Sequence, residues 1–129
     1  PRRQDLGAVM STTRIDTNAI PRRRLNGQGE FAEILNRDLA GAENVVGTLR
    51  WLEGGQHFDA EPLEETHQLI YLMEGEGVIR LDGKDYEVAK GAGIYLGPSE
   101  TASIGHRGDG TLKLFHLVVP IREELQLDA

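Results

Sequence analysis

The chain has 129 residues, of which 39% are hydrophobic and 27% charged, and its formal net charge is −7. This length predicts one domain, and the absence of any run of about 18 apolar residues excludes a membrane-spanning helix. The negative charge argues against nucleic acids and anionic membranes as partners. The chain has no cysteine, which excludes disulfides, thiolate nucleophiles and zinc–thiolate sites and fits a cytoplasmic protein.

The N-terminal part of the chain is polar and shows no apolar period. Residues 1–9 read like a vector-derived leader in front of Met10, and they lack the charged-then-apolar pattern of a secretory signal. Residues 10–30 predict an extended or partly disordered arm. The basic cluster at residues 22–24 is interpreted as a solvated or partner-facing part of this arm rather than a nucleic-acid contact.

From Phe31 onward, short apolar runs alternate with glycine-rich turns, which is typical of an all-β sandwich or barrel. Asp82 and Gly83 accept the positive φ of a tight hairpin turn, and no stretch is long enough to supply the helical crossovers of a parallel sheet. We therefore predict a β-barrel over residues 31–121 and a C-terminal tail over 122–129. The expected strands are 31–35, 45–52, 68–73, 77–81, 86–88, 94–96, 102–104 and 112–119.

A glycine-rich strand–turn segment, Tyr71–Val78, strongly resembles the signature of the cupin superfamily. The first cupin motif has a glycine, five residues, then His-x-His, a glutamate after three or four more residues, and another glycine after six. This chain keeps the spacing without a gap, although most of the side chains differ. The matching positions are Gly55, Glu61, Leu63, Gln68 and Gly75.

The second cupin motif is matched in the same way. Gly91 opens it, residues 97–99 replace Pro-x-Gly, Ala102 takes the place of a histidine and His106 that of an asparagine. The resemblance covers roughly residues 45–120. It implies a small jelly-roll-like barrel, or double-stranded β-helix, that is often dimeric and has a ligand pocket inside.

The resemblance also implies where a metal would bind, because cupins usually hold one with three imidazoles and a carboxylate. The four positions in this chain are Glu61, Leu63, Gln68 and Ala102. Leucine and alanine carry no lone pair, and the amide of glutamine is a weak ligand for transition metals. We therefore expect no cofactor and no metal at the usual place, while a divalent metal at a displaced site stays open as an alternative.

A histidine and a carboxylate are the candidate catalytic pair. His116 lies in an alternating run in which Lys113 should face solvent, and this places His116 on the inner face with its apolar neighbours. Glu61 would orient or activate its imidazole. The alternative is a buried histidine that is hydrogen-bonded to a neighbour. His57 and His106 are expected in surface loops.

Four residues are candidate ligand contacts: Gln68, His67, Tyr71 and Trp51. Gln68 would position a polar group of the ligand, whereas the two aromatic residues add surface of a kind that more often serves core packing than ligand stacking. If Gln68 faces the pocket, His67 should face away from it, because consecutive strand residues point to opposite faces. A bulge just before the strand would reverse this arrangement.

These residues are compatible with three functions. The first is a cupin that holds a small organic molecule in the barrel without a metal. The second is a metal-independent isomerase, epimerase, lyase or cyclase that uses the histidine–carboxylate pair. The third is a metal-dependent hydrolase or dioxygenase with a rearranged site. We also expect a homodimer in which the N-terminal arm adds a strand to the sheet edge of the partner.

Overall fold

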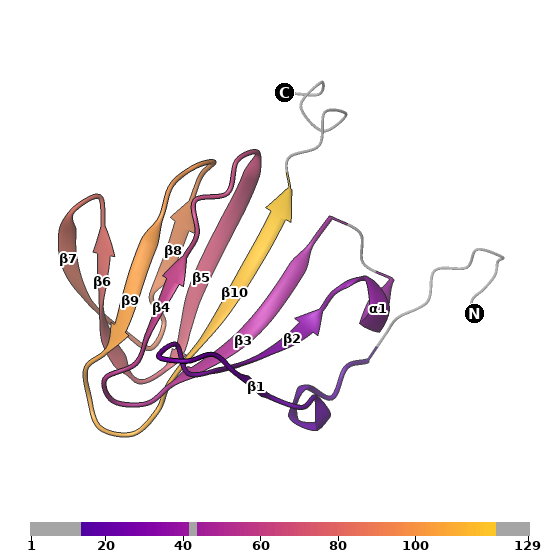
Figure 1. Cartoon of the computed structure of the whole chain (residues 1–129), viewed down its shortest axis with the longest axis horizontal. Helices are drawn as coiled ribbons and strands as arrows, with labels where there is room; N and C mark the ends of the chain where they lie inside the picture. The colour runs from indigo at the N-terminus through magenta and orange to yellow at the C-terminus, as the bar shows by residue number, and fades with distance from the viewer. Residues whose placement is uncertain (1–13, 42–43, 121–129) are drawn as a thin grey trace, which may run out of the picture.

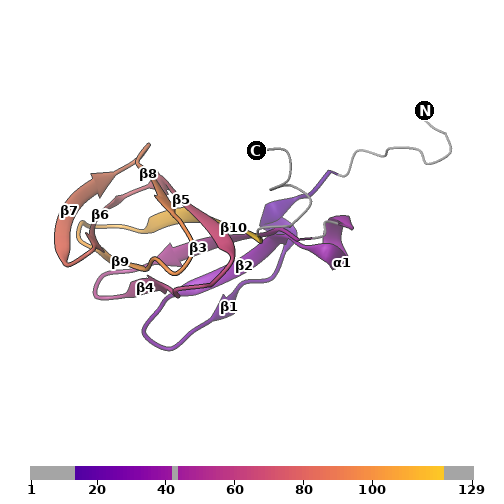
Figure 2. The same ribbon diagram turned by 90° about the horizontal axis from the view of Figure 1, so that it is seen from above.

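The computed structural model describes residues 14–41 and 44–120, and this part of the chain forms two antiparallel sheets (Figure 1). Seen from above in Figure 2, the sheets face each other around a common interior, so the all-β barrel prediction is confirmed. The larger sheet has the order β1-β2-β3-β10-β5-β8 and the smaller one β4-β9-β6-β7. The strands are β1 (Arg23–Arg24), β2 (Glu30–Leu35), β3 (Val46–Leu52), β4 (His57–Ala60), β5 (Thr66–Glu74), β6 (Glu76–Leu81), β7 (Lys84–Ala89), β8 (Gly93–Leu96), β9 (Ala102–His106) and β10 (Leu112–Pro120).

All the predicted apolar runs form strands, and their ends differ from the prediction by no more than two residues. Four short elements were not predicted: β1, β4, a 3₁₀ turn η1 (Thr17–Ala19) and one turn of helix α1 (Arg37–Ala40). The helical turn has clear local causes. The side chain of Asn36 accepts a hydrogen bond from the backbone N–H of Leu39 at 2.9 Å, and Gly41 ends the turn with a φ of 67°.

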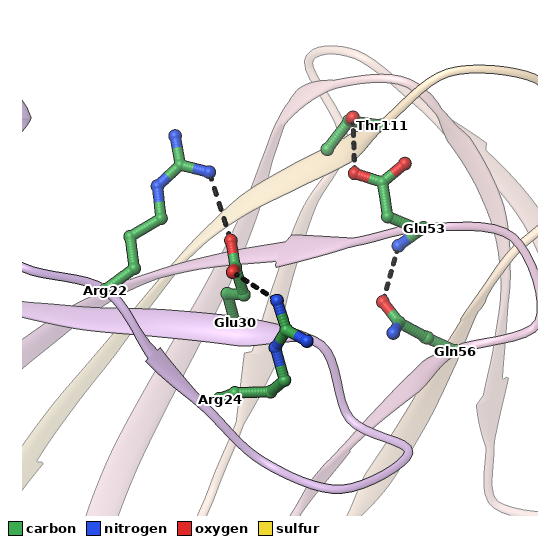
Figure 3. A network of polar contacts seen from close by, with 6 residues as sticks. All are labelled: Arg22, Arg24, Glu30, Glu53, Gln56 and Thr111. Carbon is green, nitrogen blue, oxygen red and sulfur yellow. Dashed lines mark hydrogen bonds and ion pairs between the residues drawn. The ribbon is translucent and has the colours of Figure 1, made fainter.

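The N-terminal arm pairs with its own chain. Within the described residues, β1 runs antiparallel to β2 as a hairpin, while the expected pairing of the arm with a partner's sheet edge stays a prediction. Gly27 and Gly29 have positive φ values at the turn, and Asn26-Gly27 is a strong hairpin signal. Figure 3 shows the carboxylate of Glu30 receiving hydrogen bonds from two arginines of the arm, Arg22 and Arg24, at 3.2 and 3.3 Å. These bonds lower the pKa of Glu30 and fasten the basic cluster to the sheet.

The same view contains a second group of polar contacts, which joins two loops (Figure 3). The hydroxyl of Thr111 donates to the carboxylate of Glu53 at 2.8 Å, and the backbone N–H of Glu53 donates to the side chain of Gln56 at 2.7 Å (Figure 3). These bonds connect the loop before β10 with the loop between β3 and β4. The loop between β3 and β4 is where the chain crosses from the larger sheet to the smaller one.

The core lies between the two sheets, and most of its buried side chains are apolar. Side chains alternate along each strand, so every second residue points inward. Each fully buried leucine or isoleucine contributes about 1.5–3 kcal/mol relative to an exposed one. The cluster comprises Leu52, Phe58, Ala60, Ile70, Leu72, Ile79, Ile94, Leu96, Ala102, Ile104, Leu112 and Leu114.

Some predictions fall outside the described residues. These are the leader at 1–9, the first part of the arm at 10–13 and the C-terminal tail at 122–129. Among the residues that the structure does describe, no helix has the length and hydropathy to span a bilayer.

Candidate functional site

A polar cluster lies on the inner face of the larger sheet, next to the apolar core. Gln68 of β5 and His116 of β10 point inward and are 1% and 7% exposed. Thr48 of β3 is paired with His116 and is also buried. The alternation of β10 predicted this orientation of His116, and the structure places it there. Three neighbouring strands therefore each contribute a buried polar side chain to an otherwise apolar wall.

Gln68 links His116 to the backbone of Glu61. The side-chain amide nitrogen of Gln68 is 2.9 Å from the carbonyl oxygen of Glu61 and must donate to it, because a carbonyl only accepts. The amide oxygen of Gln68 then faces Nε2 of His116 at 2.7 Å. Because this oxygen also only accepts, the proton of neutral His116 is on Nε2. Its Nδ1 is left with a lone pair, which is an acceptor for a ligand hydroxyl or N–H.

Burial keeps this histidine neutral. Removal of the imidazole from water lowers the pKa of His116 to about 4, and the positive charge of Arg50 lowers it further in the same direction. His116 is therefore uncharged at neutral pH. It acts there as a hydrogen-bonding group of fixed tautomer.

Arg50 is the charged member of the cluster and was not anticipated from the sequence. It lies on β3 opposite Leu114 of β10, on the same inner face as His116. Its guanidinium carbon is 4.1 Å from the ring centre of Phe58 and 5.3 Å from that of Phe31. The ring of Phe58 also meets His116 edge-on, with the ring centres 5.0 Å apart. Arg50 and His116 thus contact the same aromatic ring.

Two N–H groups of Arg50, at Nε and Nη1, are buried without a hydrogen-bond partner among the described residues. An unpaired buried donor costs about 1–3 kcal/mol, and more when it belongs to a charged group. Burial lowers the pKa of Arg50 to about 10, and the nearby charge of Glu33 opposes this shift. The guanidinium still carries its proton at neutral pH.

The other predicted site residues lie apart from this cluster. The side chain of Glu61 is exposed, and no contact between it and the imidazole of His116 occurs among the described residues, so their acid/base pairing stays a prediction. His67, Tyr71 and Trp51 occupy the outer face of the larger sheet. There His67 is hydrogen-bonded to the hydroxyl of Tyr95 at 2.6 Å. The ring of Trp51 lies 3.8 Å from the guanidinium carbon of Arg22. As ligand contacts, these three residues also stay predictions.

The residues at the usual cupin metal positions do not fit a metal ion. Leu63 and Ala102 have no donor atom, and Glu61 points to solvent. Both polar atoms of the Gln68 side chain are already engaged. Across residues 14–41 and 44–120, no group of three or more histidine, aspartate or glutamate side chains is arranged to hold a metal. We therefore derive no chemistry through a metal here.

A second polar cluster lies on the smaller sheet. The hydroxyl of Ser103 donates to the carboxylate of Asp59 at 2.6 Å, and His57 contacts the same oxygen at 3.1 Å. The bond from Ser103 is the main reason why the pKa of Asp59 is lowered. Because the serine bonds the carboxylate and not the histidine, the arrangement does not activate a nucleophile. His57 and His106, which were expected in loops, are end residues of β4 and β9, since both pair with neighbouring strands.

Comparison with known proteins identifies the family. The family model of the AraC-like ligand-binding domain matches residues 49–125, more than half of the chain. The chain belongs to this family. The predicted membership of the cupin superfamily is confirmed by the same match together with the solved structures below.

Two solved structures and one relative illustrate the similarity. A predicted oxalate decarboxylase from Thermotoga maritima superposes with a TM-score of 0.75 at 20% identity, over 84% of this chain and 100% of that one. A cupin protein from Bacteroides fragilis gives 0.61 at 17% identity, over 71% of this chain and 79% of that one. At these identities the likeness concerns the fold alone. An uncharacterized protein of Methanocaldococcus jannaschii is 31% identical over 62% of this chain, which spans 58% of that relative's length.

Proposed function

We propose that this cupin binds a small organic molecule on the inner face of the barrel, without a metal ion. The observation that carries the proposal is the cluster of Arg50, Gln68 and His116 in an otherwise apolar wall. Ligand pockets have this composition, with many apolar side chains and a few polar groups that orient the ligand. The family match to a ligand-binding domain supports the same conclusion.

Binding fits this cluster better than acid/base catalysis does. A general base works best when its pKa lies near the operating pH. The pKa of His116 is lowered to about 4, so its imidazole is a weak base at neutral pH. Glu61, the carboxylate that would orient it, is exposed. An isomerase or cyclase that uses this pair is therefore the weaker proposal.

The imidazole of His116 provides the test for ligand binding. We would screen a library of small polar fragments by NMR, with histidine side chains labelled, and use His57 as an internal reference. Binding compounds should shift the His116 signals and leave those of His57 in place. Gln68→Met should weaken these compounds, whereas Tyr95→Phe on the outer face should not. If the compounds that bind never perturb His116, the barrel interior is not the site.

Metal analysis separates this proposal from a metal-dependent hydrolase or dioxygenase. The metal content of protein purified without chelators would be measured by elemental mass spectrometry. We expect less than stoichiometric transition metal. One tightly bound metal per chain, retained after dialysis, would contradict the proposal and favour a rearranged metal site.

We further propose that the protein is a homodimer formed through the outer face of the larger sheet. Leu69 and Tyr95 are cross-strand partners there, and Tyr71 lies beside them on β5. All three side chains are exposed and uncharged. Two copies that each carry a charge of −7 can meet at such a patch without opposing like charges.

Sedimentation tests this interface. The wild type should sediment as a dimer at micromolar concentration, and Leu69→Lys should produce a monomer. Tyr86→Lys, which changes an exposed aromatic residue on β7 of the other sheet, is the matched control and should remain dimeric. A monomeric wild type would refute the dimer.

A further inference from the structure

Two aromatic rings lie against the guanidinium of Arg50, and two of its nitrogens lack a hydrogen-bond partner among the described residues. Phe58 and Phe31 lie over the guanidinium at 4.1 and 5.3 Å from their ring centres, which is the geometry of a cation–π contact. The N–H groups project from the rim of the planar group and not from its faces. Two of them, at Nε and Nη1, are buried and lack a partner among the described residues. Aromatic packing thus surrounds the cation without satisfying these two donors.

The nearest carboxylate does not satisfy these donors. Glu33 lies on the same face one strand away, and its charge acts on Arg50. However, its Oε1 atom accepts a hydrogen bond from the side chain of Asn36 at 2.9 Å, and no hydrogen bond joins Glu33 to Arg50 in the described residues. A buried guanidinium is usually paired, so the two orphaned donors call for an acceptor that the described part of the chain does not supply.

We propose that Arg50 binds the carboxylate of a small organic acid, which is the ligand held in the barrel. This inference rests on the proposed function and names the chemical class of its ligand. Carboxylate oxygens carry the opposite charge and accept strong, charge-assisted hydrogen bonds from guanidinium N–H groups such as those at Nε and Nη1. The lone pair on Nδ1 of His116, whose ring contacts Phe58 from β10, offers an acceptor for a hydroxyl or N–H group elsewhere on the same molecule.

The test compares acids with their neutral isosteres. Formate, acetate and benzoate would be titrated against formamide, acetamide and benzamide at low chloride, while the Nε–H signal of Arg50 is followed by NMR. Formate is included because it is small enough to reach the guanidinium whatever the shape of the site. At least one acid should shift this signal in a saturable way and bind about 10- to 100-fold more tightly than its amide, as expected for a charge-assisted hydrogen bond.

Variants assign this preference to Arg50. Arg50→Gln should abolish the preference for the acid, and Arg50→Lys should retain part of it. Arg80→Gln, which removes an exposed arginine of β6 paired with Asp85, is the control and should keep the full preference. If Arg50→Gln does not fold, the comparison of acid and amide on the wild type decides alone.

The outcomes distinguish this inference from the proposed function. If no acid, formate included, moves the Arg50 signal, the guanidinium is satisfied by water and the inference is wrong. If neutral fragments shift the His116 signals and bind equally to the wild type and Arg50→Gln, the proposed function stands and only the carboxylate assignment fails. If neither Arg50 nor His116 responds to any compound, both proposals fail.

Discussion

Each face of the larger sheet carries one histidine with a hydrogen bond to a neighbouring strand. Consecutive residues of β5, His67 and Gln68, take part in these two bonds. On the outer face, His67 bonds the hydroxyl of Tyr95 at 2.6 Å, and that tyrosine is 60% exposed. On the inner face, Gln68 bonds His116 at 2.7 Å, and both side chains are buried. The bond lengths are almost equal, but only the inner pair has lost its contact with water. Burial, more than bond length, should therefore determine what each pair contributes.

The largest difference in stability between the two faces should come from truncating their apolar residues. Leu114 is fully buried on the inner face, whereas Leu69 on the outer face is 38% exposed. Leu114→Ala should lower the free energy of unfolding by about 2–5 kcal/mol, because it leaves a cavity in a packed core. Leu69→Ala should cost clearly less at protein concentrations low enough for the chain to be monomeric. Urea unfolding of both variants measures this, and equal losses would contradict the assignment of inner and outer faces.

The next effect concerns pH. In the folded protein the pKa of His116 is lowered to about 4, while in the unfolded chain it returns to its ordinary value of 6.5. Between these values the unfolded chain binds more protons, so stability is full above about pH 6.5 and falls as the pH is lowered toward 4. The shift corresponds to a loss of about 3 kcal/mol.

This loss can be isolated by comparing the wild type with His116→Asn. Urea unfolding at pH 7, 5.5 and 4 gives the pH dependence of each protein, and the difference removes the contribution of the carboxylates. The variant should lose less stability on acidification than the wild type. Parallel curves for the two proteins would mean that His116 titrates normally in the folded state.

The smallest difference in stability should come from removing the two hydrogen bonds themselves. Gln68→Met removes the side chain that bonds both His116 and Glu61 and should cost about 1–3 kcal/mol, because the N–H of His116 and the carbonyl of Glu61 are left unpaired. Tyr95→Phe removes the outer bond and should change stability by less than about 0.5 kcal/mol. Thermal unfolding of both variants gives the comparison. A cost for Tyr95→Phe equal to that for Gln68→Met would contradict the account.

Periodicity predicted most strands because each apolar run is bounded by glycine-rich turns. It missed β4, a short strand of four residues in which only Phe58 carries a large apolar side chain, and β1, in which both residues are arginines. The Asn26-Gly27 pair was a hairpin signal that could have revealed β1. Its neighbour β2 was predicted, so the pairing of the arm within the chain was accessible from local turn chemistry.

The polar cluster was only partly predictable. Lys113 should face solvent, and this assigned His116 correctly to the inner face. The same reasoning would send Arg50 outward, although it lies inside. Leu49 and Leu52 are both buried, on opposite faces of β3, so the apolar pattern of this strand does not identify its inner face. The register of β3 against β10 decides it, and that register follows from tertiary pairing.

The aromatic residues illustrate the same limit. Trp51 and Tyr71 are candidate ligand contacts by residue type, but both lie on the outer face, where Trp51 is paired with Lys113 and Tyr71 with Phe115. A sheet with apolar side chains on both faces gives no sequence signal for which face lines the barrel interior. The carbonyl of Glu61, the part of that residue that reaches the cluster, is likewise invisible in a pattern of side chains.

The most direct test of the central claim is a crystal structure of the protein purified without chelators, with diffraction data collected to detect anomalous scattering from metals. The account predicts density for an organic molecule in contact with Arg50, Gln68 and His116, and no anomalous peak in the barrel. A fully occupied metal ion in the barrel would contradict it. So would a ligand bound elsewhere while the three side chains contact only water.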